Sequence, residues 1–165
     1  GKSTLAARLF APDDILSSDA HRGLVAGDEA DQRATRAAFS LLHRRLGRRL
    51  AEGRTVVVDA TNVQGHARRS LLRRAAAQGV PAVAIVLDLP AIEVLARNAA
   101  RPGRTVPEAV VRRQLDDLAR VAGPAGSIAS GLAAEGFAIV HVLRSAAELD
   151  AIEVEWVRVR PSPRQ

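Results

Sequence analysis

The sequence alternates short apolar segments, which tend to end on polar residues, with segments of helical periodicity. The clearest apolar run is Thr-Val-Val-Val-Asp at residues 55–59. Such a run is typical of a central parallel strand that is covered on both faces. Further apolar segments predict strands over residues 15–17, 82–87, 137–143 and 153–159. Strands that alternate with helices favour an α/β fold, with a parallel sheet flanked by helices on both faces.

The segments between the strands have the spacing of amphipathic helices. Apolar residues at this spacing predict helices over residues 5–10, 32–52, 65–78, 90–98, 107–120 and 146–150. In the second of these, one face carries Ala38, Leu41, Leu42, Leu46 and Leu50. Gly79 follows the third segment, as expected for a glycine at a helix C-terminus. Residues 122–131 are rich in Gly, Ala and Ser and predict a loop or a broken helix.

The length and composition fit one globular domain. The chain has 165 residues, of which 47% are hydrophobic, so it can bury a core and is not disordered. It has no Cys, which excludes disulfides and thiolate metal sites. No apolar run approaches the roughly 20 residues that cross a membrane, and no signal peptide is visible. We therefore expect no membrane partner and a cytoplasmic location.

The positive charge of the chain is almost entirely arginine. The formal net charge is +6, and Lys2 is the only lysine. Two interpretations stay open: a genome biased toward Arg codons, or an arginine-rich surface that binds phosphates. Aromatic residues make up 2% of the chain, which argues against a nucleic-acid binder that stacks bases on an aromatic platform.

The chain begins with Gly1, Lys2, Ser3 and Thr4, which match the end of the phosphate-binding loop G-x-x-x-x-G-K-[ST]. In such a loop the backbone N–H groups hold the β- and γ-phosphates of a nucleotide. Lys2 would add a positive charge, and the Ser3 hydroxyl would ligate Mg²⁺. The helix that this loop requires is predicted by residues 5–10. The first strand and the start of the loop would lie before Gly1. Four residues also recur by chance, so the motif needs support from the rest of the chain.

The other candidate residues follow predicted strands. Ligands of open parallel sheets bind at the carboxyl ends of the strands. This rule groups residues 1–4, 17–19, 59–62 and 88–90 at one rim. Phosphoryl transfer at that rim would need a phosphate cradle, a metal ion, a group that deprotonates the acceptor hydroxyl, and cations.

Two carboxylates at this rim have alternative interpretations. Asp19 is a candidate general base, or a cap of the following helix. Arg22, three residues later, would orient the acceptor or form an ordinary surface ion pair. Asp59 would hold Mg²⁺ through water, or it would act as a cap or as a partner of Thr61 or Asn62.

Arg97 and Arg101 are spaced i, i+4 and share a helix face if the helix continues that far. Arginines on a helix-loop-helix above a phosphate site form a lid that closes on ATP and excludes water. The alternative is a solvated basic face. The four histidines show no metal-ligand spacing.

Taken in order, these segments resemble a known family. They are Gly-Lys-Ser-Thr at 1–4, Ile-Leu-Ser-Ser-Asp-Ala-His-Arg-Gly-Leu-Val at 15–25, Asp-Glu-Ala-Asp-Gln at 28–32, Val-Val-Asp-Ala-Thr-Asn-Val-Gln at 57–64, and the three arginines of residues 97–104. Together they resemble the 5′-OH polynucleotide kinase domain of bacterial end-healing-and-sealing polynucleotide kinase-phosphatase proteins, in the P-loop kinase group. The resemblance covers essentially the whole chain.

The resemblance implies roles for individual residues. Lys2 and Ser3 would bind the ATP phosphates and Mg²⁺, within a nucleotide site formed by residues 1–4. Asp19 would be the general base for the 5′-OH, and Arg22 would position Asp19 and the phosphate of the acceptor. The lid arginines on the ATP phosphates would be Arg97, Arg101 and Arg104. Before Arg104 the sequence departs from the family pattern, because Pro-Gly at 102–103 replaces more ordinary residues.

The resemblance also implies a domain organisation. Residues 1–159 would form the kinase domain and residues 160–165 a linker toward phosphatase and ligase-like modules of the same full-length chain. The expected activity is transfer of the γ-phosphate of ATP to a 5′-OH end of DNA or RNA. Two alternatives remain open: a P-loop kinase of a small molecule or protein, and a non-catalytic nucleotide-binding module.

Overall fold

The computed structural model describes residues 1–26, 35–101 and 105–155. Arg104, the acidic segment 28–32 and the predicted linker at 160–165 lie outside the described residues. Four strands are described: β1 (Ile15–Ser17), β2 (Val57–Asp59), β3 (Val83–Leu87) and β4 (Ile139–Leu143). The α-helices described are α1 (Lys2–Leu9), α2 (Ser18–Ala26), α3 (Thr35–Ala51), α4 (Gly65–Ala77), α5 (Ala91–Ala99), α6 (Glu108–Ala119), α7 (Ile128–Glu135) and α8 (Ala146–Ala151).

The strands form two parallel pairs, as the alternation of strands and helices predicts. β1 pairs with β2, and Ser17 lies opposite Asp59. β3 pairs with β4, from Val83 opposite Ile139 to Leu87 opposite Leu143. In the described part of the chain no ladder joins the two pairs. The strand expected before Gly1 stays a prediction.

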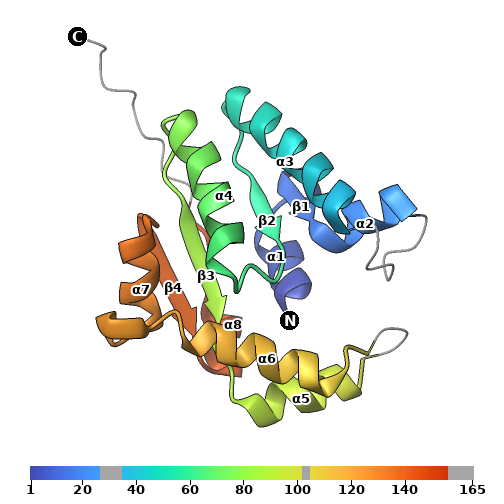
Figure 1. The fold of residues 1–165 in the computed structure, drawn as a ribbon, viewed down its shortest axis with the longest axis vertical. Helices are drawn as coiled ribbons and strands as arrows, with labels where there is room; N and C mark the ends of the chain where they lie inside the picture. The colour runs from blue at the N-terminus through green and yellow to red at the C-terminus, as the bar shows by residue number, and fades with distance from the viewer. Residues whose placement is uncertain (27–34, 102–104, 156–165) are drawn as a thin grey trace.

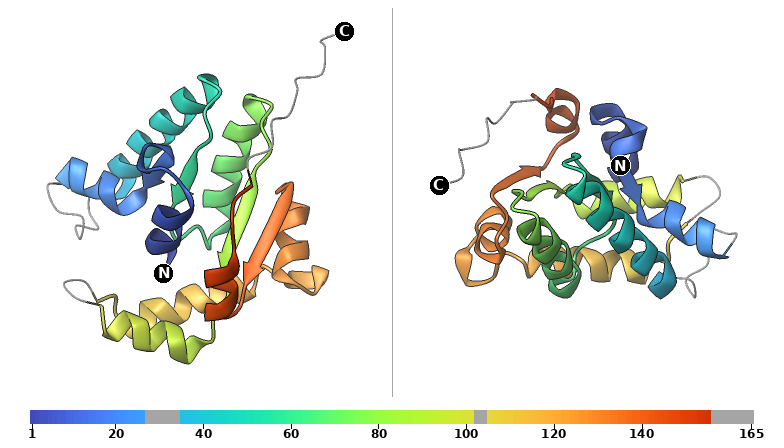
Figure 2. Two further views of the ribbon diagram at one scale, coloured as in Figure 1. Left: turned by 180° about the vertical axis from the view of Figure 1, so that it is seen from behind. Right: turned by 90° about the horizontal axis from the view of Figure 1, so that it is seen from above.

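Helices cover both faces of the strands, which confirms the predicted α/β architecture (Figure 1). α3 and α4 lie on one face, and α1 and α8 lie on the other, as the view from above in Figure 2 shows. α5 and α6 form a helical hairpin beyond the carboxyl end of β3, close to the N-terminus of the chain (Figure 1). The rim of the sheet and this hairpin therefore face each other.

The best-buried cluster lies between β1 and α3. Leu16 of β1 packs with Leu42 and Leu46 of α3, and all three are at most 4% exposed. These leucines of α3 belong to the apolar face that the sequence predicts. In contrast, the valines of β2 are only half-buried. The only described strand paired with β2 is β1, so the central place in a sheet that the apolar run predicts for β2 is not seen among the described strands.

Three other expectations differ from the structure. Residues 18–26 form α2 directly after β1, where the sequence patterns assigned no helix. α7 occupies part of the segment 122–131, which was expected to be a loop or a broken helix. Residues 153–155 are in no strand, and the rest of the last predicted strand lies outside the described residues.

Candidate functional site

The four residues of the phosphate-loop motif open α1. Gly1 is its N-cap, and Lys2, Ser3 and Thr4 form its exposed first turn, which holds no acidic residue. The first N–H groups of a helix have no acceptor within the helix, and the helix dipole favours negative charge at this end. The motif therefore forms an exposed helix end suited to an anion, as the sequence predicts.

Ser3 joins this helix end to the rim of the sheet. Its hydroxyl donates a hydrogen bond of 2.6 Å to the Asp59 carboxylate, although the two residues are 56 positions apart. Asp59 is the last residue of β2, and Ser17 lies beside it on β1. A hydroxyl and a carboxylate at this distance present hard oxygen ligands to a divalent cation. Among the interpretations of Asp59, this contact favours the one that places it at the metal site.

The metal site would be shared with the nucleotide. Within the described residues, no group of three or more His, Cys, Asp or Glu side chains is arranged to hold a metal ion. Mg²⁺ usually keeps several waters and is held by one or two carboxylates together with substrate phosphates. Ser3 and Asp59 fit that pattern, because they offer two oxygen ligands beside the phosphate cradle.

Asp19 lies in the first turn of α2, which starts where β1 ends. It is half-buried at the same rim as Ser17 and Asp59. The Ser17 hydroxyl, one position before α2, accepts a hydrogen bond from the Ala20 N–H, at 3.4 Å. Ser17 therefore makes a capping contact of the kind considered for Asp19. Arg22 is one helical turn later in α2, and its side chain lies outside the described part of the structure.

The lid arginines of the sequence analysis lie at the end of α5. Arg97 is in its last turn and forms an ion pair with Glu93 at 3.0 Å. Arg101 follows the end of the helix, so the expected shared helix face does not extend to it: α5 ends at Ala99. Asn98 donates to the Val106 carbonyl at 2.7 Å and accepts from the Val106 N–H at 3.1 Å, which fixes α5 against the start of α6.

The positive charges of Lys2 and of the two arginines at the end of α5 act at the same place, residue 1. Arg97, Lys2 and Arg101 place positive charge near residue 1, and Asp59 places negative charge there. Arg97 and Arg101 are thus close enough to residue 1 for their charges to act on it. A phosphate bound at this helix end would be in the field of all three cations.

A cleft of about 220 Å³, here called the α8 cleft, adjoins the phosphate-loop motif. Its lining residues come from α1, α5 and α8 and are Gly1, Thr4, Leu5, Arg8, Arg97, Ala146, Leu149 and Asp150. Arg8 donates hydrogen bonds to the carbonyls of Leu149, Asp150 and Ile152. Arg8 thus holds α8 against α1, a role that no sequence motif indicated.

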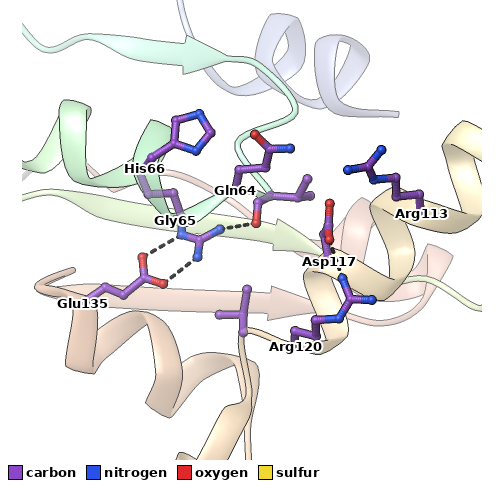
Figure 3. A pocket seen from close by; sticks show the side chains of 10 residues that line it. Gln64, Gly65, His66, Arg113, Asp117, Arg120 and Glu135 are labelled. Atoms are coloured by element: carbon purple, nitrogen blue, oxygen red, sulfur yellow. Dashed lines mark hydrogen bonds and ion pairs between the residues drawn. The ribbon is translucent and has the colours of Figure 1, made fainter.

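A second cleft of about 540 Å³, here called the α6 cleft, lies between α4, α6 and α7. It is lined by Val63, Gln64, Gly65, His66, Arg68, Arg113, Asp117, Arg120, Val121 and Glu135. Figure 3 shows Gln64 and His66 on the α4 side, and Arg113, Asp117 and Arg120 on α6. None of the predicted site residues that the structure describes lines it. The spacing i, i+4, i+7 on α6 was the one signal available in the sequence.

The base of the α6 cleft is a buried ion pair. Arg68, 7% exposed, donates to both carboxylate oxygens of Glu135, at 2.7 and 2.5 Å. Its remaining terminal nitrogen donates to the carbonyls of Asn62 and Val63, at 2.9 and 2.6 Å. Arg68 therefore ties the loop after β2 to α7, whose position depends on β4.

The sequence profile of the AAA domain family matches residues 1–124, which is most of the chain. The chain belongs to the AAA domain family. As a member of this P-loop family it is a nucleotide-binding, kinase-like module. No curated protein matches the chain. No helix in the described residues is long and apolar enough to span a membrane.

Proposed function

We propose that this AAA domain transfers the γ-phosphate of ATP to the 5′-OH end of a DNA or RNA strand. The observation that carries the proposal is the contact between Ser3 and Asp59, at the rim where Asp19 begins α2. This contact joins the phosphate-loop motif to the end of β2, and the candidate base Asp19 follows the end of the adjacent strand β1. The sequence segments around Asp19 and Asp59, which resemble polynucleotide kinases, support a polynucleotide as the acceptor.

The chemistry follows from the positions of these groups. The first turn of α1 and Lys2 hold the β- and γ-phosphates of ATP. Asp19 accepts the proton of the 5′-OH, and the oxygen attacks the γ-phosphorus. The bond to the bridging oxygen breaks, and ADP leaves. Mg²⁺ held by Ser3, with Asp59 beside it, would neutralise charge on the phosphates. Arg97 and Arg101 stabilise the negative charge that spreads over the transferred group.

The α8 cleft is the natural place for the nucleoside of ATP. It adjoins Gly1 and Thr4, and it includes Arg97. A nucleotide whose phosphates lie on the first turn of α1 can extend its nucleoside toward α8. Ser145 accepts a hydrogen bond from the Glu148 N–H and so caps α8 at the end of β4.

The proposal is tested by transfer of labelled γ-phosphate from ATP to an oligonucleotide with a 5′-OH end. The full-length protein is compared on the same oligonucleotide with a 5′-phosphate and on a panel of small-molecule alcohols and proteins. We expect transfer only to the 5′-OH oligonucleotide. Transfer only to a small molecule or a protein would show a different P-loop kinase, and ATP binding without transfer to any acceptor would show a non-catalytic module.

The role of Asp19 has its own test. Asp19→Ala should lower transfer by about 10²–10⁴-fold, the usual contribution of a general base, and leave ATP affinity nearly unchanged. Asp13→Ala is the matched control, because Asp13 is an exposed carboxylate before the start of β1, at the opposite end of the strand from Asp19. Unchanged transfer in the Asp19 variant would refute the assignment of the base.

A further inference from the structure

We infer that the α6 cleft binds a backbone phosphate of the acceptor polynucleotide, beyond its 5′ end, through Arg113. This inference rests on the proposed function, because it names where the acceptor strand of that reaction is held. It assigns a binding role to a cleft whose described lining contains no residue of the phosphate-loop motif and neither Arg97 nor Arg101.

The location of the cleft fits an acceptor strand. Val63 and Gln64 line it and follow Asp59 by four and five residues, so the cleft begins where the rim ends. The α6 and α8 clefts share no lining residue. α8 lies behind α6 in Figure 1 and in front in the reversed view of Figure 2. A nucleotide in the α8 cleft would therefore leave the α6 cleft accessible.

The charges of the cleft leave one guanidinium for a ligand. Glu135 is neutralised by the bidentate contact with Arg68, and Asp117 by Arg120 at 2.6 Å. Arg113 is exposed, and its side chain has no hydrogen bond or ion pair within the described residues. The planar guanidinium matches two oxygens of a phosphate. The cleft therefore has an excess positive charge located on Arg113.

The rest of the lining indicates a phosphate rather than a base. Apart from two valines, the side chains are polar or charged, and His66 is the only ring among the lining residues. A platform for stacked bases is therefore missing from this lining, and phosphate contacts carry no sequence information. A cleft of about 540 Å³ is within the size range of sites for small ligands, so one nucleotide unit fits.

α6 offers a matched control one residue away. Arg112 has the same charge on the same helix, but it forms an ion pair with Glu108 at 2.7 Å and does not line the cleft. Arg112→Ala and Arg113→Ala thus remove the same charge from the same helix, and only the second removes it from the cleft. Both side chains are exposed, so neither change should impair folding, and thermal unfolding checks this.

The experiment measures binding of a fluorescent single-stranded oligonucleotide with a 5′-OH end and, in parallel, the kinetics of transfer. Arg113→Ala should weaken oligonucleotide binding about tenfold, the contribution of one hydrogen-bonded charge, and leave the KM for ATP unchanged. The slope of log K against log salt should fall by roughly 0.7, the value for one phosphate of a single strand. Arg112→Ala should change neither, and Arg113→Lys should restore part of the affinity.

Acceptor length adds a second readout. A nucleoside 3′-monophosphate places no further strand in the α6 cleft, so its transfer rate should be equal in wild type and Arg113→Ala. If Arg112 and Arg113 variants lose oligonucleotide affinity equally, or neither does, the inference is overturned. The binding measurement does not require turnover. If only Arg113→Ala loses oligonucleotide affinity and the wild-type protein transfers no phosphate, the binding role of the α6 cleft is upheld and the proposed kinase activity is refuted.

Discussion

The two clefts of this AAA domain are built in different ways. The α8 cleft includes Gly1, Thr4 and Arg97, which sequence motifs single out, and its arginines have partners: Arg97 pairs with Glu93, and Arg8 binds carbonyls. The α6 cleft takes its lining from segments that no motif connects, and Arg113 is left without a partner in the described structure. The comparison teaches that a cleft beside a local motif can be recognised from the sequence, whereas a cleft such as the α6 cleft depends on how distant helices pack.

The largest expected effect concerns the base of the α6 cleft. Arg68→Ala leaves the Glu135 carboxylate partly buried without its partner, which should lower the free energy of unfolding by about 3 kcal/mol. Arg8→Ala at the exposed α8 cleft removes hydrogen bonds near solvent and should cost about 1 kcal/mol. Urea denaturation of both variants measures the difference.

A double substitution separates charge burial from packing in the same pair. Arg68→Met combined with Glu135→Met should recover most of the stability, because removing both charges leaves no buried charge unpaired. Equal stability of the double variant and Arg68→Ala would show that the Arg68–Glu135 pair is not the source of the loss.

The next effect concerns the proposed metal ligands. Asp59→Asn removes the carboxylate that accepts the Ser3 hydrogen bond, and it should raise the Mg²⁺ concentration needed for transfer by roughly 10–100-fold. Oligonucleotide binding at the α6 cleft should not change. Asp88→Asn, just after β3, is the control, because Asp88 pairs with Arg144 instead. An Mg²⁺ dependence equal to wild type would argue against Asp59 at the metal site.

A smaller effect is expected at the lid. Arg97→Ala should raise the KM for ATP about tenfold, since one charge on the phosphates is lost, and should leave oligonucleotide affinity unchanged. Glu93→Gln removes the ion-pair partner of Arg97 but keeps the guanidinium, so the KM for ATP should not rise. A loss of oligonucleotide affinity in Arg97→Ala would mean that the two clefts are not independent.

The smallest expected effect is a pH dependence of stability caused by His21, which lines neither cleft. His21 of α2 is 3% exposed, and burial lowers the pKa of its ring, with further lowering by Arg45 and Arg49 and an opposing hydrogen bond to the Ser17 carbonyl. Among the described residues, its Nε2 is buried and has no hydrogen-bond partner. Unfolded His takes up a proton near pH 6.5 and folded His21 only at lower pH, so stability falls as pH drops below about 6.5.

The variant His21→Leu checks this pH dependence. Between pH 7.5 and 5, its free energy of unfolding should fall less than that of wild type in chemical denaturation. His43, whose pKa is also lowered, first by burial and then by Arg74, should supply part of the remaining dependence. A pH profile unchanged by the substitution would contradict a neutral buried His21.

Sequence patterns predicted most of the secondary structure because each pattern reflects local physics. The spacing of Leu42 and Leu46 predicted the buried face of α3, and Gly79, with φ of 64°, ends α4 as expected. α7 was missed because its Ser and Gly residues are poor helix formers. Packing explains its glycine: a Cβ at Gly131 would lie 1.9 Å from the Val121 carbonyl oxygen.

For the candidate site too, the sequence predicted individual residues, and the structure shows which of them are in contact. Lys2 and Ser3 were predicted from the phosphate-loop motif, and Asp19, Asp59 and Arg97 from residue type and position after a strand or on a helix. Their roles in catalysis stay predictions. In the structure Ser3 donates a hydrogen bond to Asp59, and Arg97 lines the same cleft as Gly1. Arg22 and Arg104 cannot be compared in this way, because the side chain of one and the whole of the other lie outside the described residues.

The sequence by itself determined the α/β class and the end of the phosphate-binding loop, because hydrophobic periodicity and a short motif are local properties of the chain. Only the tertiary structure decided which arginine serves which purpose, and 23 of the 24 Lys and Arg residues are arginines. Arg68 is buried on Glu135, Arg8 holds α8, and Arg113 has no partner in the described chain. Identical side chains differ in role because packing sets their burial and partners, and periodicity does not encode these.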